Sequence, residues 1–189
     1  MPSSPPRLET ARCIVRPAEP GDLGALVAAV RSPLFPRRLP LAKLAASGKL
    51  SDWLDRMCSG SAEGSAFLWS IDLKEGAQCI GQVSLSPRPH SELWALAFWL
   101  DPMQWGHGYA AEASSIVIDA AFASLSIPEL WAGAALWNHR SCKVLERLGF
   151  RYFADNVPSN RVSRAPEPIR EFHLTQVQWQ CRGNPPRSA

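Results

Sequence analysis

The sequence predicts a mixed α/β fold, of the α/β or α+β class, built as a single domain. Strand-like runs and helical patterns are interspersed along the chain, which is the arrangement that defines this class. The chain has 189 residues, of which 46% are apolar, so it is long enough to bury a core of its own. The high apolar fraction excludes a disordered chain, and the composition excludes a collagen-like one.

The first half of the chain is predicted to form strands and helices separated by proline and glycine. Alternating residues ahead of Pro17 predict a strand, which proline ends because it cannot continue a ladder. Asp22 is a suitable N-cap for a helix whose apolar residues recur at i, i+3, i+4 and i+7. In chain order we expect strand 12–16, helix 22–30, short helices 41–46 and 51–58 in a proline-interrupted segment, and strands 67–73 and 79–86 joined by a hairpin.

The second half alternates between the two kinds of element. An apolar run is ended by Asp101 and Pro102, and an alanine-rich helical stripe follows it. Gly149 suits the C-terminal end of a later helix. We expect strand 93–100, helix 109–124, strand 130–137, helix 140–148, and strands 150–153 and 171–180.

The chain ends and the overall charge limit the classes of function. Residues 1–7 and 183–189 are predicted to be flexible tails around a body over 8–182. No run of residues has the composition of a signal peptide or a membrane span, so we expect a cytoplasmic protein with no membrane partner.

The five cysteines are scattered without metal-ligand spacing, which predicts reduced thiols and no metal site. A net charge of +3 falls short of the excess that is typical of nucleic-acid binders.

A glycine-containing turn, Gln104-Trp105-Gly106-His107-Gly108-Tyr109-Ala110, lies between a predicted strand and a predicted helix. Glycines let the backbone turn sharply, so that N–H groups can converge on a phosphate at the positive end of the helix dipole. The spacing lacks the Gly-Lys-Ser/Thr of a P-loop. A pyrophosphate cradle and a simple strand-to-helix turn both remain open on this pattern alone.

Several segments in sequence order resemble the GNAT acetyltransferases, specifically the RimJ/RimL-like branch of N-acetyltransferases. They are Leu8-Glu9-Thr10-Ala11-Arg12 with Arg16-Pro17 and Asp22, then Ile80-Gly81-Gln82-Val83, then Phe98 to Pro102 with Trp105 to Ala113, and finally Asn138-x-x-Ser141 followed by Val144 to Phe150. Trp105 stands where the superfamily often has Arg or Gln, as is common in this branch. Together these segments span nearly the whole predicted body.

The resemblance implies a mixed, splayed central sheet flanked by helices, with acetyl-CoA as the acetyl donor and no metal. The pantetheine arm would insert where the strands ending near Leu100 and Trp137 part. The implied cofactor-binding residues are Leu100, Trp105, Gly106, His107, Gly108, Tyr109, Ala110 and Asn138.

Acetyl transfer requires a neutral amine and a proton for the departing thiolate. By the resemblance, Ser141 is the thiol-side donor, and Asn138 binds the pantetheine arm or a water while also serving as a helix N-cap. Relatives often place a carboxylate near the position of Ala95, and Glu92 is the nearest candidate for the general base. A water relay is the alternative to Glu92.

The acceptor is expected to be a primary amine, attacked directly in a ternary complex. In the family, segments 31–60 and 151–170 border the acceptor entrance, and both carry net positive charge here. A positive rim repels polyamines, which favours a peptide N-terminus or an amino-acid-like small molecule. Two alternatives stay open, a non-catalytic CoA-binding regulatory module and a nucleic-acid binder. The protein is expected to be a monomer or a homodimer that pairs through its last strand.

Overall fold

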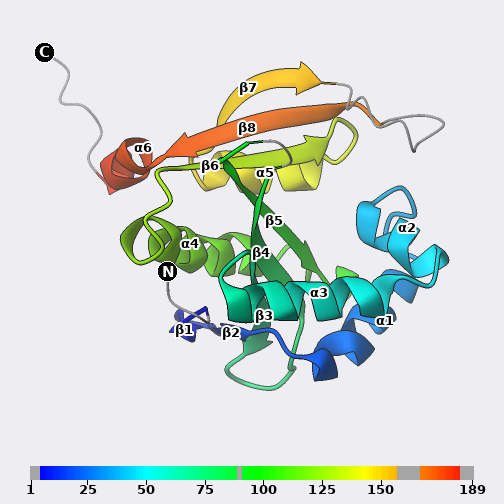
Figure 1. The fold of residues 1–189 in the computed structure, drawn as a ribbon. Coiled ribbons are helices and arrows are strands. Elements are labelled where there is room, and N and C mark those ends of the chain that lie inside the picture. The colour runs from blue at the N-terminus through cyan, green and yellow to red at the C-terminus, as the bar shows by residue number, and fades with distance from the viewer. Residues whose placement is uncertain (1–4, 89–90, 157–166, 184–189) are drawn as a thin grey trace, which may run out of the picture.

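A computed structural model describes residues 5–88, 91–156 and 167–183, and these form one eight-stranded sheet with helices on both sides (Figure 1). The strands are β1 (Leu8–Glu9), β2 (Cys13–Pro17), β3 (Phe67–Leu73), β4 (Gly81–Pro87), β5 (Trp94–Leu100), β6 (Glu129–Ala135), β7 (Arg151–Asn156) and β8 (Ile169–Thr175). The helices are α1 (Leu23–Arg31), α2 (Pro40–Ala46), α3 (Leu50–Glu63), α4 (Tyr109–Ala123), α5 (His139–Arg147) and α6 (Gln176–Gln180). Short 3-10 turns lie at Pro20–Asp22, Pro102–Gln104 and Cys181–Gly183.

The sheet is splayed at its centre, as the sequence predicted. Its strand order is β1-β2-β3-β4-β5-β6-β8-β7, and every neighbouring pair is antiparallel except β5 and β6. These two parallel strands pair only at their beginnings, where Trp94 faces Leu130 and Ala95 faces Trp131. Beyond that point they diverge toward their carboxyl ends (Figure 1). The predicted mixed α/β class is confirmed.

The helices cover the two sides of the sheet with different cores. Small and β-branched residues of α4, including Ala113 and Val117, are buried against β2, β4 and β5. Helix α5 adds Cys142 and Leu145 to the same core. On the other side, α3 packs on β3, while α1 and α2 form a second apolar cluster with Trp99 of β5.

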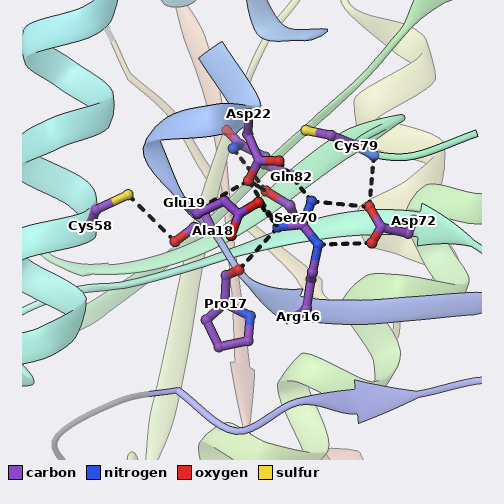
Figure 2. A network of polar contacts seen from close by, with 10 residues as sticks. All are labelled: Arg16, Pro17, Ala18, Glu19, Asp22, Cys58, Ser70, Asp72, Cys79 and Gln82. Atoms are coloured by element: carbon purple, nitrogen blue, oxygen red, sulfur yellow. Dashed lines mark hydrogen bonds and ion pairs between the residues drawn. The ribbon is translucent and has the colours of Figure 1, made fainter. Parts of the chain in front are cut away.

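A buried network of polar side chains ties β2, β3, β4 and the start of α1 together (Figure 2). The Arg16 guanidinium reaches Asp22 at 2.7 Å and Asp72 at 2.8 Å. The Ser70 hydroxyl donates to Asp22 at 2.6 Å, and the Gln82 amide donates to Ser70 at 3.1 Å. Asp22, Asp72, Ser70 and Gln82 are all buried, so each of these contacts replaces water that folding removed.

This network corrects the predicted role of Asp22. Its side chain makes no capping hydrogen bond to α1. It instead accepts hydrogen bonds from Arg16, from Ser70 and from the backbone N–H of Glu19. The network also reaches the centre of the sheet, because the Trp99 indole N–H donates to the Gln82 side chain at 3.0 Å.

The end of the chain differs from the prediction of a strand over 171–180. Strand β8 stops at Thr175, and residues 176–180 form α6. Thr175 and Gln178 make a reciprocal capping box, in which each side chain bonds the other residue's backbone N–H. A capping box starts a helix even when the apolar pattern is compatible with a strand.

One further expectation, that the last strand lies at a sheet edge, is wrong. The last strand, β8, lies inside the sheet between β6 and β7, so the edge strands are β1 and β7. Pro5 falls in the predicted N-terminal tail, yet it is buried. The carbonyl of Pro6 accepts a hydrogen bond from the Trp69 indole at 2.9 Å. Residues 1–4 and 184–189 of the predicted tails lie outside the described residues.

Candidate active site

The glycine-containing turn lies at the carboxyl end of β5 and opens directly into α4. Gly106 and Gly108 have φ angles of +86° and +83°, which L-residues with a side chain adopt only at a cost. Gly108 is the N-cap of α4 and supplies no capping side chain. The first N–H groups of α4 therefore remain available to a ligand at the positive end of the helix dipole.

The turn is fixed to the sheet by its own tryptophan and by the residues before it. The Trp105 indole N–H donates to the carbonyl of Leu100 at 3.1 Å. The Asp101 side chain accepts from the backbone N–H of Met103 at 2.9 Å. The two contacts hold the turn against the end of β5, where β5 and β6 have already parted.

Arginines from two other elements surround this turn. A Cβ placed on Gly108 would lie 3.6 Å from a terminal nitrogen of Arg12 and 3.9 Å from one of Arg147. The Arg140 guanidinium lies 4.7 Å from the centre of the Trp105 ring. The sequence does not indicate that these arginines lie near the turn, because nothing local links the β1–β2 connection or α5 to it. They make the environment of the turn positive, which suits an anionic ligand.

Glu112 of α4 has a structural role beside the turn. It accepts hydrogen bonds from the Thr10 hydroxyl at 2.6 Å and from the Arg12 guanidinium at 2.8 Å. Burial would by itself raise the pKa of Glu112, but these hydrogen bonds outweigh it and hold the pKa below its usual range. Glu112 therefore stays ionised and positions Arg12, which also lies 4.5 Å from the ring centre of Tyr109. The exposed His107 stacks on that same ring at 5.6 Å.

Asn138 and Ser141 form a hydrogen-bonded pair just beyond the end of β6. The side-chain amide oxygen of Asn138, Oδ1, caps α5 by accepting a hydrogen bond from the backbone N–H of Ser141 at 3.3 Å. Its amide N–H₂ donates to the Ser141 hydroxyl at 2.9 Å. The hydroxyl oxygen accepts this bond, and no side chain or carbonyl in the described segments accepts the Ser141 proton, which can therefore be donated to a ligand. Cys142 points the other way and is buried in the core.

The structure brings the predicted residues of the turn together with Asn138 and Ser141, but it leaves Glu92 apart. Arg140, next to Ser141, contacts Trp105, so the start of α5 lies beside the turn. Glu92 is exposed and precedes β5, at the opposite end of that strand from Leu100. Six residue steps along β5 correspond to about 20 Å.

A second group of residues joins the two segments that were expected to border the acceptor. The Arg38 guanidinium donates to both oxygens of Glu167, at 2.8 and 2.9 Å, and these hydrogen bonds lower the pKa of Glu167. The Trp137 indole N–H also donates to Glu167 at 3.0 Å. Arg170 pairs similarly with Asp155 at 3.1 Å. These pairs bring the acids of segment 151–170 against arginines of both segments, whose net charges remain positive.

Within the described segments, no group of three or more His, Cys, Asp or Glu side chains is arranged to hold a metal ion. Over the same segments, no helix has both the length and the apolar character needed to cross a membrane.

In this sheet the parallel strands β5 and β6 diverge, and a glycine turn leads into α4 where they are apart. This combination defines the class of proteins with the acetyltransferase fold. The family description "Acetyltransferase (GNAT) domain" matches residues 12–151. The chain belongs to the GNAT acetyltransferase family, whose members are N-acetyltransferases that use acetyl-CoA.

Solved structures with this fold include the ribosomal-protein-S5-alanine acetyltransferase from Vibrio fischeri, with a TM-score of 0.71, 21% identity, and coverage of 93% of this chain and 99% of that one. RimJ from Mycobacterium smegmatis, in complex with CoA-disulfide, has a TM-score of 0.70, 19% identity, and coverage of 93% and 85%. A spermidine N-acetyltransferase chimera that includes the Vibrio cholerae enzyme has a TM-score of 0.73, 14% identity, and coverage of 91% and 100%. The shared fold thus serves acceptors of different chemistry.

Proposed function

We propose that this protein transfers the acetyl group of acetyl-CoA to a primary amine, by direct attack in a ternary complex, and that the amine belongs to a peptide N-terminus or an amino-acid-like small molecule. The observation that carries the proposal is the position of the Asn138–Ser141 pair beside the glycine turn, where β5 and β6 part. The donor supplies an activated thioester. The chain's own residues bind, orient and supply a proton.

The turn would hold the pyrophosphate of the donor. The backbone N–H groups that follow Gly108 would bind its oxygens, and Arg12 and Arg147 would add positive charge. Leu100 and Trp105 would border the pantetheine arm at the end of β5. The positive φ angles of Gly106 and Gly108 fit this role, because they let the backbone itself approach the ligand.

Ser141 would protonate the departing sulfur. When the amine nitrogen forms its bond to the carbonyl carbon, the carbon–sulfur bond breaks and the sulfur takes up the Ser141 proton. The Ser141 oxygen then regains a proton from water, which receives the one that the amine releases. The hydrogen bond from Asn138 orients the hydroxyl for this transfer. The amine loses its own proton to water, which is the alternative to Glu92 as the base.

The experiment that tests the function is thiol release from acetyl-CoA by the purified protein with a panel of amines. The panel contains peptides beginning with Ser, Ala or Met, acidic amino acids, spermidine and an aminoglycoside. We expect turnover with peptides or amino acids and sequential kinetics, because no covalent enzyme intermediate forms. Ping-pong kinetics would contradict direct attack. Binding of acetyl-CoA without turnover of any amine would favour a non-catalytic CoA-binding module.

Replacing Gly108 by alanine should weaken acetyl-CoA binding. A side chain at a φ of +83° costs about 1–2 kcal/mol, which corresponds to an increase in Kd of about 5- to 30-fold if the turn must adopt this conformation to bind. Titration calorimetry with acetyl-CoA measures the Kd directly. Gly24→Ala is the matched control, because a Cβ at Gly24 of α1 meets open space and its backbone is helical. An unchanged Kd in Gly108→Ala would show that the turn is not the phosphate site.

A further inference from the structure

A hollow of about 260 Å³ lies outside the site described above and opens on the sheet beside the point where β5 and β6 part. We call it the Arg88–Trp131 hollow. It is lined by Arg88, Ser91, Leu93, Trp131, Phe153 and Glu171. These residues come from the end of β4, the turn that follows it, and strands β6, β7 and β8.

The hollow faces away from α4 and α5. In β6, Leu130 and Ala132 are buried in the core that those two helices cover. Trp131 and Gly133 alternate with them and therefore point to the opposite side of the sheet. Glu171 of β8 lies directly across from Gly133, so its carboxylate is on the same side as the Trp131 ring.

The polar groups of the hollow include both hydrogen-bond donors and an acceptor. The Arg88 guanidinium lies 4.6 Å from the centre of the Trp131 ring and donates one bond to Glu171 at 2.8 Å. The second Glu171 oxygen and the other Arg88 nitrogens have no bond within the described residues. The Trp131 indole N–H is buried and has no partner in that part of the chain. Phe153 meets the Trp131 ring edge-on at 4.8 Å and is 57% exposed.

The hollow begins within two residues of the point where the strands part. Trp131 is in the last parallel pair, opposite Ala95, and Gly133 is the next residue of β6 on the same side. Two residues of a strand span about 7 Å. An extended chain that runs from the parting of the strands along β6 would place its second and third residues over the hollow.

We propose that the Arg88–Trp131 hollow binds the second and third residues of a peptide whose N-terminal amine is the acceptor. This inference rests on the proposed function. Each peptide unit carries one donor and one acceptor, which match the Glu171 carboxylate and the Arg88 N–H groups. The flat rings of Trp131 and Phe153 provide apolar area for a peptide side chain. A polyamine finds no such match, because Arg88 already neutralises Glu171.

The test is a series of acceptors that differ only in length: serine amide, Ser-Ala amide and Ser-Ala-Ala-Ala amide. We expect kcat/KM to rise about tenfold or more from the one-residue to the four-residue acceptor, and Arg88→Gln to remove most of that rise through KM. Serine amide should be used equally well by both proteins. The matched control is Arg170→Gln, since Arg170 also pairs with an acid and lies over an aromatic ring, that of Tyr152 at 5.5 Å, but does not line the hollow.

The outcomes separate this inference from the proposed function. If kcat/KM is independent of length, or if Arg88→Gln keeps the full rise, the inference is wrong although the enzyme is active. If spermidine is preferred to every peptide, the inference is wrong as well. If no acceptor turns over, calorimetry with the four-residue peptide in the presence of CoA decides: binding that Arg88→Gln weakens supports the hollow, and no binding overturns it. Thermal melting and acetyl-CoA binding of each variant verify that it is folded.

Discussion

Replacing Ser141 by alanine is expected to lower kcat by about 10²- to 10⁴-fold, the range for loss of a positioned proton donor. The Kd for acetyl-CoA should stay close to that of the wild type. The reason is the hydrogen-bond pattern: the hydroxyl oxygen accepts from Asn138, which leaves the proton for the leaving sulfur. Thiol-release kinetics at saturating acetyl-CoA measure kcat, and calorimetry measures the Kd.

The fold should tolerate this change, so that the kinetic effect can be assigned to the hydroxyl. The cap of α5 is a bond from the backbone N–H of Ser141 to Asn138, and alanine keeps that N–H. His139→Ala is the matched control, because His139 is exposed in the same turn of the helix. If Ser141→Ala retained the wild-type kcat, sulfur protonation would have to come from solvent. In that case the Asn138–Ser141 pair would only cap the helix.

The features of the site that the sequence predicted are local ones. Positive φ angles at Gly106 and Gly108, and the cap of α5 by Asn138, depend on residues a few positions apart. The beginning of α6 is equally local, since Thr175 and Gln178 form a capping box that can be read from the chain. The apolar pattern over 171–180 predicts a strand, and the capping box ends that strand at Thr175.

The features that the sequence did not predict depend on contacts between distant segments. Arg12, which directly precedes β2, lies beside the glycine turn because Glu112 of α4 holds its guanidinium. The distance of three residues from Ala95 predicts Glu92 as the base, but Glu92 precedes β5, at the end of that strand opposite the glycine turn. The spacing of residues along the sequence does not predict which end of a strand faces a ligand. The hollow over Trp131 depends in the same way on residues from four strands or their ends.

Replacing Asp22 by alanine should destabilise the protein by about 3 kcal/mol, at the lower end of the range for breaking a buried ion pair. Arg16 would lose its contact at 2.7 Å but keep Asp72 at 2.8 Å, which limits the loss. The Ser70 hydroxyl would also lose its acceptor. Urea unfolding at pH 7 measures the change. Asp155→Asn, in the exposed pair with Arg170, is the control and should change the free energy of unfolding by less than about 1 kcal/mol.

The pH dependence of a second variant, Asp22→Asn, separates the charge of Asp22 from its packing. Burial by itself would raise the pKa of Asp22, but hydrogen bonds from Arg16, Ser70 and the Glu19 N–H outweigh it, so the folded pKa lies below the usual value. A lowered folded pKa gives stability that is present above the unfolded pKa of about 4 and is lost as the pH falls through the folded value. The gap in unfolding free energy between wild type and Asp22→Asn should therefore be largest near neutral pH and shrink below about pH 4. A gap of constant size down to pH 2 would mean that the carboxylate contributes through its shape and hydrogen bonds rather than its charge.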